Sequence, residues 1–254
     1  MSRRTVLVTG GAKRLGASIV RRLAADGHRV VIHYGASADD AEALAAEVGA
    51  AATVQGDLAD TGAIDALFAR ARAAAGPIDG LVNSASAFEF DRPPASDPAL
   101  LARLHAINCA APALLADALA RQDDVADGAV VNLLDQKLAN LNPDFFAYTC
   151  GKAALAAATV MQAQALGPRV RVNAVAPGLT LPSADQTPEE FAAVASANLL
   201  RRPVGAEAVA DAVAYLIGSR GVTGQTIWVD CGQRFLARDG DVMFERDNGA
   251  ERRG

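Results

Sequence analysis

A tyrosine and a lysine four residues apart form the first pair in this sequence whose types and spacing suit chemistry. They are Tyr148 and Lys152, in the segment Tyr-Thr-Cys-Gly-Lys. On a helix, this spacing places both side chains on one face. A nearby ammonium lowers the pKa of a phenol because it stabilises the phenolate, which would suit Tyr148 to proton transfer near neutral pH. Surface pairs with this spacing are common, so the interpretation depends on the rest of the chain.

A glycine-rich turn near the N-terminus is the second candidate. It joins a compact apolar strand expected at Thr5–Thr9 to the start of a helix. Glycines let the backbone approach a pyrophosphate, and the free N–H groups of a helix N-terminus favour its charge. An ordinary tight connection is the alternative interpretation. The residues expected to contact a dinucleotide here are Gly10, Lys13, Arg14, Leu15 and Gly16.

The end of the second expected strand indicates which dinucleotide would bind. It reads His33-Tyr34-Gly-Ala-Ser37, without the Asp or Glu that usually holds the ribose 2′-hydroxyl of NAD. Lys13, Arg14, His33 and Ser37 could instead surround a 2′-phosphate with donors and positive charge. We therefore expect NADPH rather than NADH as the cofactor.

Short β-branched apolar runs alternate with longer alanine-rich helical stretches along the chain. The expected strands are Thr5–Thr9, Val30–Tyr34, Ala51–Gln55, Gly80–Asn83, Val130–Leu134, Val170–Val175 and Thr226–Val229. The expected helices are Ala17–Ala25, Ala38–Val48, Ile64–Ala75, Leu100–Ala120, Tyr148–Leu166 and Ala206–Ile217. Strands that are apolar on both faces and separated by helices predict an α/β fold, with a doubly wound parallel sheet in a single domain. That domain would span residues 1–236, with a charged C-terminal tail at 237–254.

Composition narrows the class of protein further. The 254 residues are 51% hydrophobic, which excludes a disordered chain, and the net charge of -5 argues against a nucleic-acid or acidic-membrane binder. The three cysteines form no CxxC pair, and no histidine has a spaced partner for metal binding. The apolar stretch at the N-terminus stops at Thr9, too short for a signal peptide or membrane span. We expect a cytoplasmic enzyme without a metal.

Taken together, these segments resemble the short-chain dehydrogenase/reductase family over nearly the whole chain, to about Phe235. The resemblance implies a Rossmann-type fold of seven parallel strands and hydride transfer from the nicotinamide. It also implies that Lys152 holds the nicotinamide ribose and that Asn108 supports a water leading to Lys152. The matching segments are Thr9–Gly16, Asp57-Leu58, Asn83–Ser86, Asn108, Tyr148 with Lys152, Asn173–Gly178 and Thr223–Asp230.

The same resemblance implies further cofactor contacts. Asp57 would accept a hydrogen bond from the adenine amino group, although it is also placed to cap a helix. The full set of further contacts is Asp57, Leu58, Asn83, Ala85, Ser86, Tyr148, Lys152, Pro177, Gly178 and Thr180.

Two departures from the family pattern are informative. Arg14 replaces the middle glycine of the usual TGxxxGxG turn, and Asp135 stands where the family commonly has a catalytic serine. Both are features of the pteridine reductases, a branch that includes dihydromonapterin and alternative dihydrofolate reductases. By this resemblance Phe88 would stack on a pterin and Ser86 would make a polar contact. Ala36 differs from that branch, which often has an arginine beside the 2′-phosphate.

An aspartate at position 135 suits the reduction of a pterin C=N bond. That reaction needs hydride at carbon and a proton at nitrogen. A buried carboxyl beside a phenol can have a raised pKa and relay a proton to a ring nitrogen. We therefore expect an NADPH-dependent reductase of a dihydropterin or dihydrofolate. Its catalytic residues would be Asp135, Tyr148, Lys152 and Asn108, and its substrate contacts Ser86, Phe88, Asp135 and Tyr148.

The sequence leaves two other functions open, and the family resemblance also implies an assembly state. The same chemistry could reduce a ketone or a 3-oxoacyl thioester, with Arg201 and Arg202 as a basic contact for an acyl carrier. A dinucleotide-sensing protein without catalysis is a further alternative. Family members usually form tetramers through two long helices, here Leu100–Ala120 and Tyr148–Leu166, so a homotetramer is expected. The polar stretch Pro182–Pro188 resembles the family's substrate-binding loop.

Overall fold

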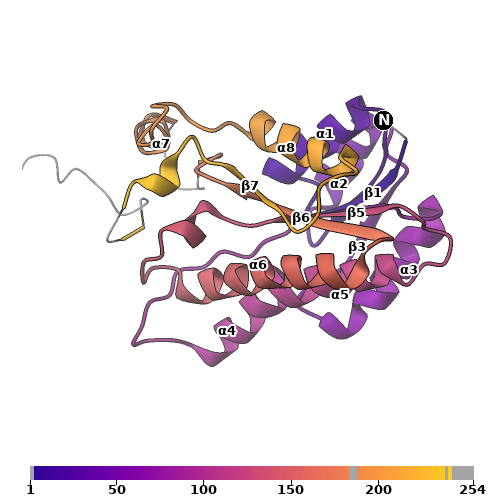
Figure 1. Ribbon diagram of the computed structural model, residues 1–254, viewed down its shortest axis with the longest axis horizontal. Helices are drawn as coiled ribbons and strands as arrows, with labels where there is room; N and C mark the ends of the chain where they lie inside the picture. The colour runs from indigo at the N-terminus through magenta and orange to yellow at the C-terminus, as the bar shows by residue number, and fades with distance from the viewer. Residues whose placement is uncertain (1–2, 183–187, 238–239, 242–254) are drawn as a thin grey trace, which may run out of the picture.

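Seven parallel strands form one sheet in the computed structural model, which describes residues 3–182, 188–237 and 240–241 (Figure 1). The strand order is β3-β2-β1-β4-β5-β6-β7. In chain order the strands are β1 Thr5–Thr9, β2 Arg29–Tyr34, β3 Ala52–Gln55, β4 Gly80–Asn83, β5 Gly128–Leu133, β6 Val170–Pro177 and β7 Thr226–Val229. Residues 183–187 of the expected substrate loop, and most of the expected tail, lie outside the described residues.

Helices cover both faces of the sheet, as Figure 1 shows. The helices α1, α2 and α8 pack on one face, and α3, α5 and α6 on the other, with α4 against α6. Their bounds are α1 Arg14–Ala25, α2 Ala38–Val48, α3 Ile64–Ala75, α4 Pro98–His105, α5 Ala111–Ala120, α6 Phe146–Leu166, α7 Pro188–Ala195 and α8 Ala206–Gly218. The doubly wound parallel fold predicted from the sequence is confirmed.

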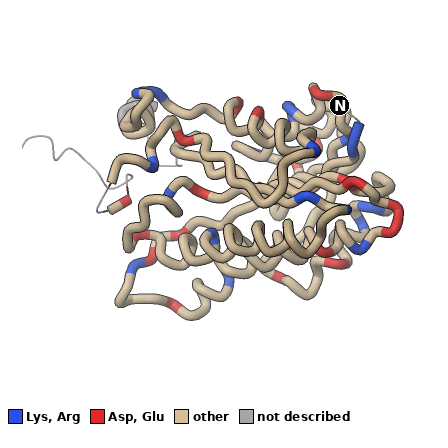
Figure 2. The backbone as a smooth tube through the Cα atoms, viewed as in Figure 1, with Lys and Arg blue, Asp and Glu red and all other residues tan. Residues whose placement is uncertain are grey.

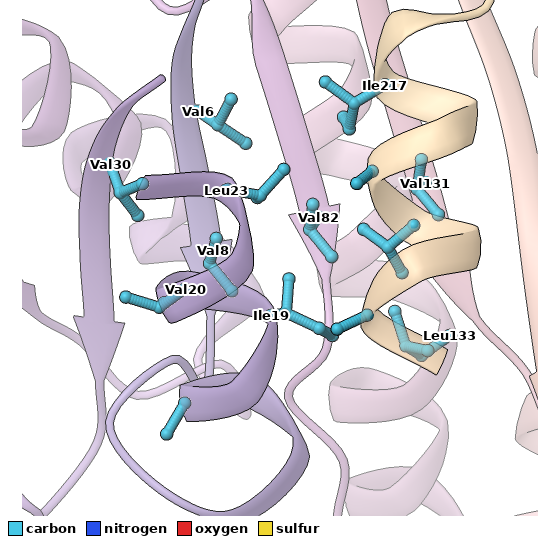
Figure 3. Packing of buried hydrophobic residues seen from close by; sticks show 14 of the residues in the cluster. Val6, Val8, Ile19, Val20, Leu23, Val30, Val82, Val131, Leu133 and Ile217 are labelled. Atoms are coloured by element: carbon cyan, nitrogen blue, oxygen red, sulfur yellow. The ribbon is translucent and has the colours of Figure 1, made fainter. Parts of the chain in front are cut away.

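Alternation along each strand explains why both faces must be covered. In β1, Val6 and Val8 point to the face that carries α1 and α8, where they join one buried cluster with Ile19 and Leu23 (Figure 3). Leu7 points to the opposite face, toward α3 and α5. All three β1 side chains are completely buried. Burying each such side chain contributes roughly 1.5–3 kcal/mol relative to leaving it exposed, so both layers of helices stabilise the sheet.

The sheet places its chemistry at the carboxyl ends of the strands. The order reverses between β1 and β4, because the chain first winds outward to β2 and β3 and then returns to the other side of β1. Side chains and loops that follow β1, β4, β5 and β6 therefore meet at one edge. In open α/β sheets, ligands bind in the crevice at this reversal.

The expected helix Leu100–Ala120 is interrupted. Between α4 and α5 lies the segment η2, Ala106–Ala110, which has π-helical hydrogen bonding and contains Asn108. Such single-turn π segments are frequent at functional sites. The whole stretch Pro98–Ala120 is long and apolar enough to span a membrane by length and composition, with an 18-residue window of mean hydropathy 1.4. Here, however, Leu104, Leu115 and Leu119 are buried inside the fold.

Candidate active site

A hydrogen bond joins Tyr148 to Asp135 at the carboxyl edge of the sheet. The Tyr148 hydroxyl, in the first turn of α6, donates to Asp135 Oδ2 at 2.8 Å. Asp135 follows β5 and caps the short helix η3, Gln136–Ala139, where its Oδ1 accepts from the Lys137 backbone N–H at 2.8 Å. Both carboxyl oxygens are thus engaged, so the carboxyl group is held in one orientation beside the phenol.

Lys152 lies under this pair and is almost fully buried. Its Nζ donates to the Leu133 carbonyl at 2.7 Å and stands 5.7 Å from the centroid of the Tyr148 ring. Burial lowers the pKa of Lys152 to about 8, although the Asp135 charge acts in the opposite direction. The predicted helical pair of Tyr148 and Lys152 therefore exists, and the ammonium is hydrogen-bonded to the end of β5.

The electrostatics of the phenol differ from the expectation. Burial, together with the Asp135 charge and the hydrogen bond to it, raises the pKa of Tyr148 well above its usual value. Burial also raises the pKa of Asp135, against the opposing effects of the Lys137 N–H, Tyr148 and Lys152. The expectation that Lys152 lowers the Tyr148 pKa is therefore corrected. The geometry favours a protonated phenol next to a carboxyl group that protonates more readily than usual.

An open cleft of about 520 Å³ surrounds these groups. Most of the residues expected at the site line this cleft, and they come from the ends of β1, β4, β5 and β6 and from the first turns of α1 and α6. The expected residues that line it are Gly10, Lys13, Arg14, Leu15, Gly16, Ala85, Ser86, Phe88, Asp135, Tyr148, Lys152, Pro177, Gly178 and Thr180. The lining residues that the sequence did not single out are Ser84, Leu133, Leu134, Leu179 and Leu181. Their place just after strand ends is the signal that could have found them.

Close packing explains the glycines of the first turn. Gly10 has φ +60°, and a Cβ there would lie 2.8 Å from the Ala85 Cα. A Cβ on Gly16 would collide with the Gly10 carbonyl. Because the obstructing atoms belong to the backbone, neither position accepts a side chain without moving the turn. The turn is therefore a backbone cradle at the N-terminus of α1, the type of site that holds a pyrophosphate.

Arg14 adopts a backbone conformation that normally favours glycine. Its φ is +51°, in the left-handed region, at the position where the family has its middle glycine. The Arg14 guanidinium donates to the Pro182 carbonyl at 2.8 Å, which links the glycine turn to the segment after β6. Lys13 pairs with Asp40 of α2 at 2.8 Å, and both side chains are about half-exposed.

His33 does not reach the cleft. Its ring is buried, with Nδ1 accepting from the Gly10 N–H at 3.2 Å and Nε2 lying 3.1 Å from the Gly56 carbonyl. This arrangement places the proton on Nε2. Burial lowers the His33 pKa to about 4, against the effect of the Gly56 hydrogen bond. The expectation that His33 supplies positive charge to a 2′-phosphate is therefore corrected, because the neutral ring instead positions Gly10.

Four other expected cofactor residues stand around the cleft without lining it. Tyr34 ends β2, and Ser37 is the residue before α2. Asp57 is exposed and accepts from the Ala59 N–H at 2.9 Å, which closes a local turn. Leu58 is buried in the core beneath α3.

Two buried asparagines support the cleft from behind. The Asn108 carboxamide accepts from the Ser86 hydroxyl at 2.8 Å and the Ala87 N–H at 3.2 Å, and donates to the Ala87 carbonyl at 2.8 Å. It therefore holds the segment after β4 rather than contacting Lys152 directly. Asn83 donates to Asn132 at 2.8 Å and so ties β4 to β5.

Phe88 forms an aromatic wall beside the phenol. It lines the cleft and is 44% exposed. Beneath it lies Phe145, buried, with φ +52° at the start of α6. Phe145 stacks against Phe88 and does not line the cleft itself.

The fold and this cleft define an α/β oxidoreductase with a Rossmann-type sheet. A family described as enoyl-(acyl carrier protein) reductase matches residues 10–234. The chain belongs to the short-chain dehydrogenase/reductase family.

Known proteins of similar sequence and structure agree with this assignment. The structure of FolM alternative dihydrofolate reductase 1 from Brucella suis in complex with NADP is 42% identical, with a TM-score of 0.88, covering 92% of this chain and 96% of that one. Pteridine reductase 1 from Leishmania tarentolae is 32% identical, covering 89% of this chain and 94% of the relative. L-xylulose reductase from Bos taurus is 34% identical, with 92% and 97% covered. The predicted resemblance to the pteridine reductase branch is confirmed.

Proposed function

We propose that this protein is an NADPH-dependent reductase of a dihydropterin or dihydrofolate. The observation that carries the proposal is the hydrogen bond between Tyr148 and Asp135 in a cleft walled by Phe88. A serine would polarise a ketone oxygen. A carboxyl group with a raised pKa beside a phenol instead suits proton delivery to a ring nitrogen.

The glycine turn supports a dinucleotide as the cofactor. The positions where a Cβ would meet backbone, at Gly10 and Gly16, leave the space that a pyrophosphate needs. Lys13, Arg14 and Ser37 are the residues that would hold a 2′-phosphate, and Lys152 would hold the nicotinamide ribose. NADP in the Brucella suis relative agrees with this choice. When bound, NADPH supplies the hydride from its nicotinamide C4.

The side chains of this protein would supply the proton and would orient the substrate ring. Phe88 stacks against the flat ring of the substrate, and Ser86 gives a polar contact beside it. Tyr148 donates its hydroxyl proton to the substrate nitrogen, and protonated Asp135 restores that proton through their hydrogen bond. The C=N bond becomes CH–NH, with one hydride and one proton added, and Asp135 is reprotonated from solvent. Asn108 keeps Ser86 in place.

Activity measurements on a substrate panel test the proposal. NADPH oxidation should occur with dihydrobiopterin, dihydromonapterin or dihydrofolate, and not with ketones or 3-oxoacyl thioesters. The ketone alternative has support from the L-xylulose reductase relative, and turnover confined to carbonyl substrates would establish it instead. In a Tyr148→Phe variant, NADPH oxidation should fall about 10²–10⁴-fold while NADPH binding persists. Binding without turnover in the wild-type protein would instead indicate a dinucleotide sensor.

We also propose that the protein forms a homotetramer in the cytoplasm. Helix α6 is almost free of charge (Figure 2), since Lys152 is its one charged residue. Lys152 is buried, while Val160 and Met161 on the same helix are 46% and 60% exposed. An apolar exposed face of this kind is typical of an interface between subunits. All three cysteines are free, which suits a reducing compartment. Light scattering of the wild-type protein and a Met161→Glu variant tests the assembly, since the variant should dissociate.

A further inference from the structure

The chain after β7 returns to the segment that joins Asp135 to α6. It forms the short helix η4, Gln233–Phe235, which packs against η3, and residues 236 and 241 contact residues 137–144. The Asn140 side chain donates to the Leu236 carbonyl at 2.8 Å, and the Asp241 N–H donates to the Asp144 carboxylate at 2.8 Å. Residues near the C-terminus therefore contact the segment that carries the candidate acid.

A buried ion pair is a further contact between these two parts of the chain. Lys137 Nζ lies 2.7 Å from Asp241 Oδ2, and the two side chains are only 5% and 12% exposed. An ammonium removed from water needs a counter-charge close by, because burying it alone carries a large desolvation penalty. Asp241 supplies that charge from 104 residues further along the chain.

Lys137 connects this ion pair to the candidate active site in two ways. Its backbone N–H donates to Asp135 Oδ1 at 2.8 Å, which helps to orient the carboxyl group. Its ammonium lies 5.4 Å from the centroid of the Phe145 ring, on which Phe88 stacks. A displacement of Lys137 would therefore disturb both the acid and the aromatic wall.

The same C-terminal stretch also contacts the opposite side of the cleft. The Gln233 side chain accepts from the Leu179 N–H at 3.0 Å, in the loop after β6. Gly178 permits this approach, since a Cβ there would lie 2.7 Å from Gln233 Oε1. One stretch of chain thus contacts both the segment after β5 and the segment after β6, and it fixes their positions relative to each other.

We propose that Asp241 is a positioning residue. It holds Lys137 in place, and through Lys137 it fixes the orientation of Asp135. It also sets the net charge that faces the Asp135–Tyr148 pair. This inference rests on the proposed function in one respect, the role of Asp135 as the acid. The assignment gives a role to residue 241, which lies within the charged C-terminal tail expected at 237–254.

The charges around Asp135 define the expected effect. From α6 it is faced by Tyr148 and Lys152, from η3 by Lys137, and from the C-terminal stretch by Asp241. Across the cleft, Lys13 and Arg14 are the cations of the glycine turn. Asp241 contributes to raising the pKa of both Asp135 and Tyr148. Removing it leaves the Lys137 charge unbalanced, so Asp135 should lose its proton at lower pH.

The test compares the full-length protein with its Asp241→Asn variant in the NADPH complex. We expect the kcat for dihydropterin reduction to fall about tenfold at neutral pH, with the KM for NADPH unchanged. The decline of this kcat at rising pH should begin about one pH unit lower than in the wild type. Asp241→Glu should restore most of the activity. Lys137→Met/Asp241→Asn, which removes both charges, should return the pH profile toward that of the wild type. Asp123→Asn, an exposed residue away from the cleft, is the matched control.

A titration without substrate separates this inference from the proposed function. In protein with ¹³C-labelled aspartate carboxyl groups, the Asp135 signal is assigned by its loss in Asp135→Asn. Its midpoint should move to lower pH in Asp241→Asn, whatever substrate the enzyme reduces. An unchanged midpoint, or a loss of kcat without a shifted pH profile, would overturn the positioning role while leaving the pterin assignment intact. A shifted midpoint in a protein that reduces no pterin would support the role and reject that assignment.

Discussion

Phe88 lies nearly parallel to Phe145, with ring centroids 4.0 Å apart and 20° between their planes, and stands perpendicular to Tyr148 at 4.7 Å. Offset stacking and edge contacts of this kind hold an aromatic ring in a defined orientation. Phe145 is buried, so it fixes the position of Phe88 from below. The cleft thus combines a flat apolar wall with a proton donor beside it.

Removal of this wall should weaken substrate binding more than catalysis. In Phe88→Ala, we expect the KM for a dihydropterin to rise about 5- to 150-fold, since base–aromatic stacking contributes about 1–3 kcal/mol in comparable sites. The KM for NADPH should change little. Steady-state kinetics with both substrates measure the difference, and Phe235→Ala, at a residue 65% exposed outside the cleft, is the control. Equal effects on both KM values would contradict a stacking role.

Replacement of the acid by the usual serine should change the preferred reaction. In Asp135→Ser, the hydroxyl still accepts from or donates to Tyr148 but cannot supply a proton with a carboxyl pKa. We expect pterin reduction to fall by about 10²-fold or more, and any ketone reduction to fall less. The ratio of kcat/KM values for the two substrates measures this. An equal loss for both would remove the special role of Asp135.

Because Arg14 has a left-handed backbone conformation, we predict that its replacement by glycine stabilises the fold but weakens NADPH binding. In Arg14→Gly, the cost of φ +51° disappears, so the free energy of unfolding should rise by about 1 kcal/mol. The bond to Pro182 and one cation of the cleft are lost at the same time, so the Kd for NADPH should increase. Denaturant unfolding and fluorescence titration measure the two effects. A variant that binds NADPH as tightly as the wild type would show that Arg14 contributes no phosphate contact.

The buried His33 should make the fold sensitive to acid. Its pKa is about 4 in the folded chain and 6.5 as the reference value, so between these limits the unfolded chain binds more protons. Stability must therefore rise with pH from 4 to 6.5, by at most about 3 kcal/mol from this group, and be lost on acidification. His33→Asn should flatten that dependence in urea unfolding measured across the window. Because the His28 pKa is also lowered, His28→Asn serves as the comparison. An unchanged slope in His33→Asn would mean that another group titrates.

The positions of the strands and helices could be predicted from the sequence because each depends on a local pattern of apolar residues. Each strand must be apolar on both faces, and each helix carries its own periodicity, so ranges such as Thr5–Thr9 and Ala38–Val48 match the structure at both ends. The Tyr148–Lys152 pair is equally local. Asp135 could be identified through the family resemblance, because it stands where the family commonly has its catalytic serine, and the structure places its side chain in contact with Tyr148.

Other features depend on burial and on distant segments, which spacing does not record. The direction of the Tyr148 pKa shift follows from desolvation, not from the position of Lys152. His33 is neutral because its ring is enclosed between Gly10 and Gly56. The pairing of Lys137 with Asp241 joins two parts of the chain that no local pattern relates. Helix α7 was also missed, since it follows a polar stretch that resembles a loop.

The π segment at Ala106–Ala110 has a consequence for the phase of the long helical stretch that contains it. A π turn accommodates one more residue than an α-helical turn, and each residue of an α-helix rotates the chain by about 100°. Without that extra residue, the helix would continue smoothly, but α4 would face a different direction relative to α5. In the present arrangement the Asn108 carboxamide meets the Ser86 hydroxyl and the Ala87 carbonyl. A one-residue irregularity in a helix therefore sets where the wall of the cleft is anchored.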